Sequence, residues 1–213
     1  MQLISIDEAR TLYHTADSVH DFDHILRVLV LAERIAQAEG ADLVITSSAA
    51  LLHDWGRGEV ESSQTNHAKV AADRARSYLM QRGTAPVVVN AIVHAIEAHR
   101  FRTPPLPQTL EAKVLFDADK LDAIGAIGIA RAFAYGGAHN QRLWAARESV
   151  NLRRWQEQGD DADAHTPVHE FVVKLSRIHK QLYTAMGRRI AEERHLYMSA
   201  FFDRLGCEVR GEA

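Results

Sequence analysis

Residues 49–58 read Ala49-Ala50-Leu51-Leu52-His53-Asp54-Trp55-Gly56-Arg57-Gly58. Four apolar residues lead into an adjacent His and Asp, and two glycines then break the helical pattern. An imidazole and a carboxylate at the apolar end of a helix are costly to bury unless a partner satisfies them. A divalent metal ion is one such partner, because neutral imidazole and carboxylate both bind it well. The alternative is a His favoured by the helix dipole and followed by a solvated Asp.

The rest of the chain has the same helical character. Apolar residues recur every three or four positions, which is typical of amphipathic helices. The pattern predicts helices over residues 23–39, 42–54, 66–82, 85–99, 110–135 and 168–205. We expect Gly40 to be a C-cap and Asp42 an N-cap, while Gly125 and Gly128 inside the 110–135 pattern suggest close helix packing. We therefore predict a single compact all-α domain over residues 1–213, with a core at 18–205 and seven to nine helices.

Composition excludes several classes of protein. The 213 residues include one cysteine, Cys207, which rules out intramolecular disulfides, cysteine-rich zinc modules and iron–sulfur clusters. A formal net charge of −3 argues against binding to nucleic acids or membrane surfaces driven by charge. The sequence has no apolar run long enough to span a bilayer and no signal peptide, so we expect a cytoplasmic protein. A homodimer is one alternative that the sequence leaves open.

Two more residues lie on apolar helix faces far from the His-Asp pair. His24 shares a face with apolar residues one and two turns away, and Asp119 shares a face with Leu115 and Phe116. Asp117 is nearly opposite Asp119, so we expect it to be solvated or to cap a helix. Buried acids are rare without a cation or an arginine partner. For His24 alone, a hydrogen-bonded core histidine is the alternative.

The ordered set of His24, His53-Asp54 and Asp119 resembles the HD superfamily of metal-dependent phosphohydrolases. Residues 20–28, with the pattern HDxxHxxRV, residues 117–128, which read DADKLDAIGAIG, and residues 169–175 also resemble one bacterial HD hydrolase subfamily. The resemblance implies that His24, His53, Asp54 and Asp119 are metal ligands and that Asp54 also orients or deprotonates water. This donor set suits Mn²⁺, Fe²⁺, Co²⁺, Ni²⁺ or Zn²⁺, with Mg²⁺ fitting less well.

Other residues are candidates for a second ion or for substrate binding. His67 and His99 would bind a second metal ion or, as helix-terminal residues, interact with the helix dipole and cap the helix. Asp122 would orient the metal ligands without binding the first ion itself. One ion is the default expectation and two the alternative. Four cations are candidates for binding phosphate, or else extend to solvent from amphipathic helices: Arg27, Lys120, Arg131 and Lys174.

These residues predict an enzyme. We expect metal-dependent hydrolysis of a phosphoester or phosphoanhydride bond in a small phosphorylated substrate, with a nucleotide as the leading class. The alternative is a metal-stabilised ligand-binding or signalling module without catalysis.

Overall fold

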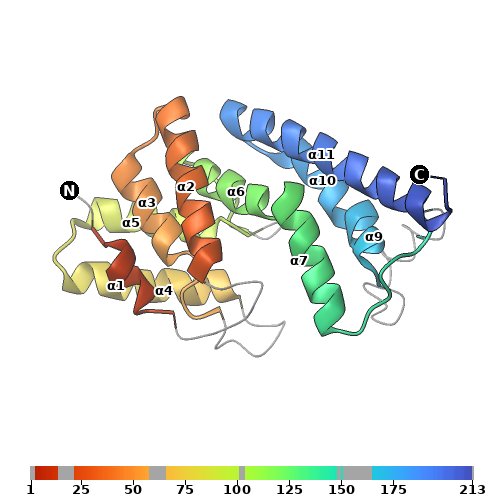
Figure 1. The fold of residues 1–213 in the computed structure, drawn as a ribbon. Helices are drawn as coiled ribbons and strands as arrows, with labels where there is room; N and C mark the ends of the chain where they lie inside the picture. The colour runs from red at the N-terminus through yellow and green to blue at the C-terminus, as the bar shows by residue number, and fades with distance from the viewer. Residues whose placement is uncertain are drawn as a thin grey trace. The chain divides into compact units, whose positions relative to one another are not determined.

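The computed structural model describes residues 3–13, 22–57, 66–100, 104–147, 150 and 165–212. Within these ranges the chain forms helices and no strand, and eight of the α-helices have five or more residues (Figure 1). The predicted all-α class is therefore confirmed. None of the described helices has the combination of length and apolar character that a membrane span requires.

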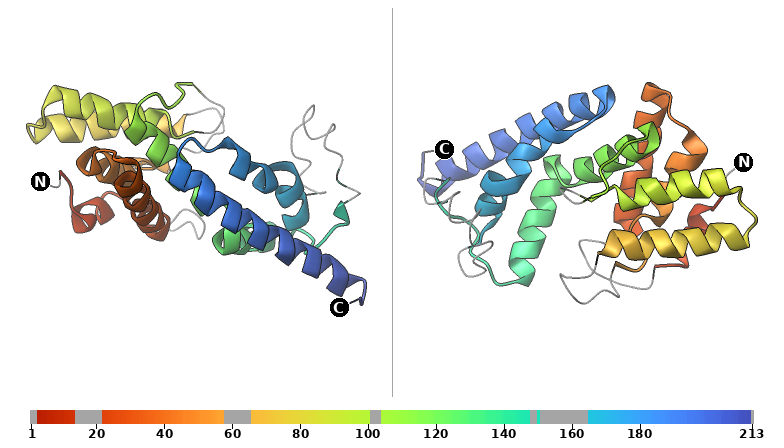
Figure 2. Two further views of the ribbon diagram at one scale, coloured as in Figure 1. Left: turned by 90° about the horizontal axis from the view of Figure 1, so that it is seen from above. Right: turned by 180° about the vertical axis from the view of Figure 1, so that it is seen from behind.

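The chain divides into two compact units, which we describe separately. Unit 1 comprises Met1–Leu121 and Leu182–Gly187, and unit 2 comprises Asp122–Gln181 and Arg188–Ala213. Six helices account for most of unit 1: α1 (Ile6–Arg10), α2 (Phe22–Glu39), α3 (Leu43–Leu52), α4 (His67–Gln81), α5 (Pro86–Glu97) and α6 (Leu110–Asp122). Helices α4 and α5 lie side by side (Figures 1 and 2), and α3 packs against both α2 and α5.

The helix ends of unit 1 follow the sequence signals. Gly40 has φ +77° and follows the last residue of α2, as a C-cap glycine does. The Asp42 carboxylate accepts hydrogen bonds from the N–H groups of Val44 and Ile45 at the start of α3. Apolar side chains of α2, α3, α5 and α6 fill the core, among them Ile25, Val28, Ile35, Leu51, Leu52, Ile92, Ile96 and Leu115. Burying each of these side chains stabilises the fold by about 1.5–3 kcal/mol.

The predicted single helix over residues 110–135 is wrong, because the first helix, α6, ends at Asp122 and a second one begins at Gly125. Ile124 is extended, and Gly125 has φ +79° and begins α7 (Gly125–Ala138). A Cβ at Gly125 would lie 2.9 Å from Cγ of Arg194, and a Cβ at Gly128 would collide with the carbonyl oxygen of Ala123. Close packing thus explains both glycines, as expected, but periodicity alone could not locate the break.

Unit 2 also contains the C-terminal helices. These are α9 (Pro167–Glu170), a π-helical turn at Phe171–Leu175, α10 (Ser176–Ile178), a 3₁₀ turn at His179–Gln181 and α11 (Ala185–Val209), whose first three residues belong to unit 1. The predicted helix over 168–205 is therefore interrupted at residues 182–184. Stacked aromatic rings hold unit 2 together, with the ring centroids of Phe171 and Phe202 4.4 Å apart.

Candidate metal centre

Three helices of unit 1 bring the four predicted ligands together. His24 lies in the first turn of α2, His53 and Asp54 directly follow α3, and Asp119 lies in the last turn of α6. The side chains of His24, His53 and Asp54 are buried, and that of Asp119 is largely buried. Nε2 of His24 lies 3.3 Å from Nε2 of His53 and 3.5 Å from Oδ1 of Asp119. These three residues form a group compact enough to hold one metal ion.

A second group forms around Asp54. His67 is the first residue of α4, and its Nε2 lies 3.7 Å from Oδ1 of Asp54. His99 follows α5, and its Nε2 lies 3.6 Å from the same oxygen. Asp54, His67 and His99 also lie close enough to one another to hold an ion. The structure thus places both second-ion candidates beside the His-Asp pair.

The Asp54 carboxylate lies between the two groups. Its Oδ2 is 3.9 Å from Nε2 of both His24 and His53, whereas its Oδ1 faces the other two histidines. Oδ1 is buried and has no hydrogen-bond partner among the residues that the structure describes. Because a buried, unsatisfied carboxylate oxygen is costly, a cation beside Oδ1 fits this arrangement.

Backbone carbonyl groups orient two of the histidines. Nδ1 of His53 is 2.8 Å from the carbonyl oxygen of Ala50, and Nδ1 of His99 is 2.6 Å from that of Ile96. A carbonyl oxygen only accepts, so the proton of each neutral ring lies on Nδ1. The lone pair of each Nε2 is then directed toward the carboxylates, as metal-binding histidines require.

The electrostatics keep these groups in their metal-binding forms at neutral pH. Burial lowers the pKa of His53 to about 4 and that of His67 to about 3, so both rings stay neutral. Burial alone would raise the pKa of Asp54, but His53, His99 and Arg57 together hold it well below its ordinary value. The pKa of Asp119 is likewise lowered despite burial, with Lys120 as the main cause.

Cationic side chains lie beside the carboxylates. Nζ of Lys120 donates to Oδ2 of Asp119 at 2.6 Å. Nη1 of Arg57 donates to Oδ2 of Asp54 at 2.8 Å, a contact that the sequence analysis missed. A basic residue three positions after Asp54, in a turn closed by glycine, is the signal that could have indicated it. Arg27 lies on α2 one turn after His24 and is half-buried.

The remaining predicted site residues lie in unit 2, outside both ligand groups. Asp122 is buried, and its Oδ2 accepts a hydrogen bond from Nη1 of Arg131 at 3.1 Å. Lys174 is exposed and donates to Oε1 of Glu170 at 2.7 Å. Asp122 and Arg131 thus form an ion pair with each other, and Lys174 forms an ion pair with Glu170, which lies one helical turn away.

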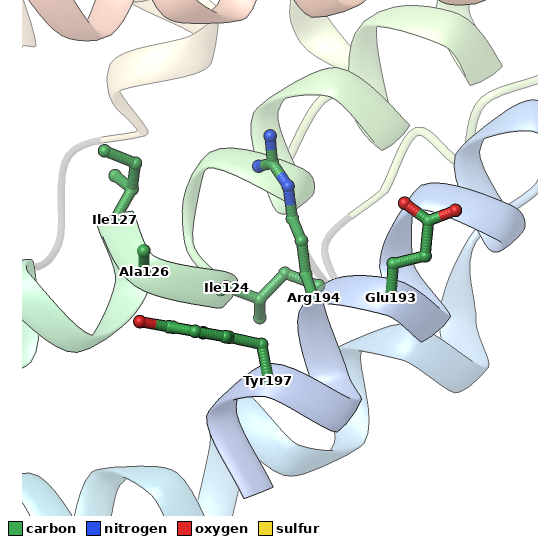
Figure 3. Close-up of a pocket in the computed structure, with 7 residues that line it drawn as sticks. Ile124, Ala126, Ile127, Glu193, Arg194 and Tyr197 are labelled. Atoms are coloured by element: carbon green, nitrogen blue, oxygen red, sulfur yellow. The ribbon is translucent and has the colours of Figure 1, made fainter. Parts of the chain in front are cut away.

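Unit 2 has a pocket of its own, with a volume of about 290 Å³. Its lining comes from the start of α7 and from α11, and includes Ile124, Ile127, Arg194 and Tyr197 (Figure 3). The Tyr197 ring extends toward Ala126, and Glu193 and Arg194 rise from α11 beside it. None of the predicted site residues lines this pocket.

Known proteins resemble this chain over most of its length. A model of the HD domain family matches residues 21–124. The chain is 32% identical to the Bacillus subtilis protein YpgQ over 198 residues, which cover 91% of this chain and 86% of YpgQ.

Solved structures show the same similarity. The crystal structure of Bacillus subtilis YpgQ in complex with ADP matches with a TM-score of 0.73 and 31% identity, covering 98% of this chain and 100% of that chain. The crystal structure of a predicted HD superfamily hydrolase from an uncultured Thermotogales bacterium matches with a TM-score of 0.63 and 30% identity, covering 95% and 88%. Both likenesses extend well beyond residues 21–124.

Proposed function

This chain belongs to the HD superfamily, and we propose that it is a metal-dependent phosphohydrolase acting on a small phosphorylated substrate. The bond cleaved is a phosphoester or phosphoanhydride bond. The observation that carries the proposal is the Asp54 carboxylate between two groups of ligands, with a buried oxygen that lacks a hydrogen-bond partner among the described residues.

We propose two ions where the sequence suggested one. His24, His53 and Asp119 would hold the first ion, His67 and His99 would hold the second, and Asp54 would contact both. Two imidazoles in each group favour Mn²⁺, Fe²⁺, Co²⁺, Ni²⁺ or Zn²⁺ over Mg²⁺. When bound, a divalent ion lowers the pKa of water and stabilises negative charge on phosphoryl oxygens.

The protein's own residues prepare the site for this chemistry. The lowered pKa of Asp54 makes its carboxylate a weak base, so its proposed role is to orient water and ligands rather than to accept a proton. Arg57 and Lys120 place positive charge beside the carboxylates, where a phosphoryl group would approach. Arg27 would add a further cation from α2. Such charges stabilise phosphate oxygens by charge-assisted hydrogen bonds.

A nucleotide is the proposed substrate. The YpgQ structure contains ADP, and that protein matches this chain over nearly its whole length. A nucleotide supplies the phosphoanhydride or phosphoester bond that the proposed chemistry requires. We also propose Arg131 and Lys174 as substrate-binding residues. Each forms an ion pair with a carboxylate of unit 2, which a phosphate group would have to displace.

The test combines metal analysis with a phosphate-release screen. The purified wild-type protein would be analysed for bound metal and assayed with a nucleotide panel in Mn²⁺, Co²⁺, Zn²⁺ or Mg²⁺. Asp54→Ala and Asp119→Ala should each lower turnover strongly, whereas Asp7→Ala, an exposed change on α1, should not. Wild-type turnover that survives both ligand changes would refute the proposed hydrolase activity. Metal and ADP binding without product would instead favour the non-catalytic module.

A further inference from the structure

Arg74 of α4 packs directly against the turn that carries Asp54. Gly56 in this turn has φ +95°, a backbone conformation that favours glycine. A Cβ at Gly56 would lie 2.5 Å from Nη1 and 2.8 Å from Cζ of Arg74, so the guanidinium occupies the space that a side chain would take. Cζ of Arg74 also lies 5.9 Å from the ring centroid of Trp55, within the range of a cation–π interaction.

One face of α4 supplies two contacts to this turn. His67 and Arg74 are seven residues apart, which is about two helical turns, so they lie on the same side of α4. His67 faces Oδ1 of Asp54, and Arg74 covers Gly56 two residues later. The turn is also held from within, because N–H of Arg57 donates to the carbonyl oxygen of Asp54 at 3.0 Å. Arg74 therefore couples the backbone beside Asp54 to the helix that bears His67.

A surface cavity of about 370 Å³ lies beside this contact. Arg74 and Trp55 line it together with Ser77 and Tyr78, and the Tyr78 ring meets Trp55 edge-on with centroids 6.0 Å apart. Shortening Arg74 would extend this open space as far as Gly56 and admit water to the turn.

We infer that Arg74 is a positioning residue: it fixes the Asp54 turn against α4 and thereby sets the affinity of the Asp54, His67 and His99 group for its ion. The inference rests on the proposed metal-dependent function. Residues that orient metal ligands without binding the metal typically change metal affinity or activity 10- to 100-fold when substituted.

The test compares Arg74→Met and Arg74→Lys with Arg76→Met. Arg76 lies on the same helix and donates to Asn90 of α5, so the control removes a guanidinium from α4 without touching the turn. The first measurement is hydrogen–deuterium exchange of the peptide over residues 53–57 in metal-free protein. The second is Mn²⁺ titration of each variant. The third is kcat and KM for a nucleotide that the wild type hydrolyses.

Arg74→Met should speed exchange over residues 53–57, weaken one Mn²⁺ site at least about 10-fold and lower kcat with little change in KM. Arg74→Lys keeps the charge but loses the planar group, so its values should lie between those of Arg74→Met and wild type. Arg76→Met should match wild type. Unchanged exchange in Arg74→Met, or faster exchange with unchanged Mn²⁺ affinity, would overturn the inference. If Arg74→Met does not fold, the same readouts on Arg74→Lys decide.

The outcome for Arg74 can be separated from that for the proposed function. Wild-type protein that binds Mn²⁺ and releases phosphate while Arg74→Met behaves identically refutes the role of Arg74 alone. Wild-type protein that binds none of Mn²⁺, Fe²⁺, Co²⁺, Ni²⁺ and Zn²⁺ refutes the proposed metal dependence and the effect of Arg74 on affinity together. The exchange data from metal-free protein then still show whether Arg74 holds the turn.

Discussion

Asp117 on α6 accepts two hydrogen bonds from Thr184, one from its N–H at 2.7 Å and one from its hydroxyl at 2.6 Å. Asp117 is fully buried, so the expectation of a solvated side chain is wrong. Asp117 does not itself cap α11: the Thr184 hydroxyl accepts from the N–H of Gly187 in the first turn, and Asp117 holds that hydroxyl. Thr184 lies 67 positions from Asp117, just before α11 begins. A Cβ at Gly187 would lie 2.5 Å from Oδ2 of Asp117, which explains the glycine there.

The Asp117–Thr184 contact predicts a large stability effect. In Asp117→Asn, an amide nitrogen replaces one acceptor oxygen, so buried donors lose their partner. We expect the free energy of unfolding to fall by about 1.5–3 kcal/mol. Urea denaturation of metal-free protein measures this, with the exposed Asp203→Asn as the matched control. An unchanged midpoint would mean that the Asp117–Thr184 contact contributes little.

Histidine substitutions should distinguish the two ligand groups. His67→Ala should reduce bound Mn²⁺ from two ions to one, because the group of His24, His53 and Asp119 stays complete. Asp54→Ala should weaken both sites, since its two oxygens face different groups. Elemental analysis after dialysis gives the stoichiometry. His94→Ala serves as the control, because His94 lies on α5 and belongs to neither ligand group. Equal metal content in all variants would contradict the two-ion site.

Loss of the Asp54 carboxylate should also have a large effect on the rate. Stabilisation by a metal ion is worth several kcal/mol in the transition state, and each 1.36 kcal/mol is a factor of ten. We therefore expect Asp54→Ala to lower kcat/KM by about 1,000-fold. Initial rates of phosphate release at saturating Mn²⁺ measure this loss. A decrease below tenfold would exclude an essential role for Asp54.

Metal-free protein should lose stability as the pH falls from about 6.5 toward 4. Burial lowers the folded-state pKa of His53 to about 4, whereas the ordinary value is 6.5. The unfolded state therefore binds the proton first, and the stability present above pH 6.5 is lost as the pH approaches 4. The change is on the order of 3 kcal/mol for His53, with a further loss from His67. Urea midpoints at a series of pH values test this, and His53→Asn should show a smaller slope.

Two glycines of α7 should respond oppositely to alanine. Gly125→Ala places a side chain at φ +79° and against Arg194, so we expect a loss of about 1–3 kcal/mol. Gly137 lies in the same helix with nothing within 4 Å of its Cβ position, so Gly137→Ala should stabilise the protein by about 0.5–1 kcal/mol. Thermal unfolding of both variants makes the comparison. Equal shifts would contradict the strained start of α7.

Local patterns predicted much of this protein correctly. Apolar periodicity predicted the all-α class and placed the bounds of α2, α4 and α5 within two residues, because helix formation depends on neighbours three and four positions apart. The cap at Asp42 and the glycine end at Gly40 are local for the same reason. The order of His24, His53-Asp54 and Asp119 was sufficient to indicate the superfamily, and the structure brings these four side chains together.

Other features depend on contacts between residues far apart in the chain. The helix break at Ile124 follows from the packing of Gly125 on Arg194, and the interruption before α11 accompanies the hydrogen bonds from Thr184 to Asp117. Both oxygens of Asp54 acquire their roles only when α2, α3, α4 and α5 converge on one carboxylate. Helical periodicity is set within a few residues, whereas these positions are set by side-chain packing and charge across tens of residues, so they emerged only in the folded chain.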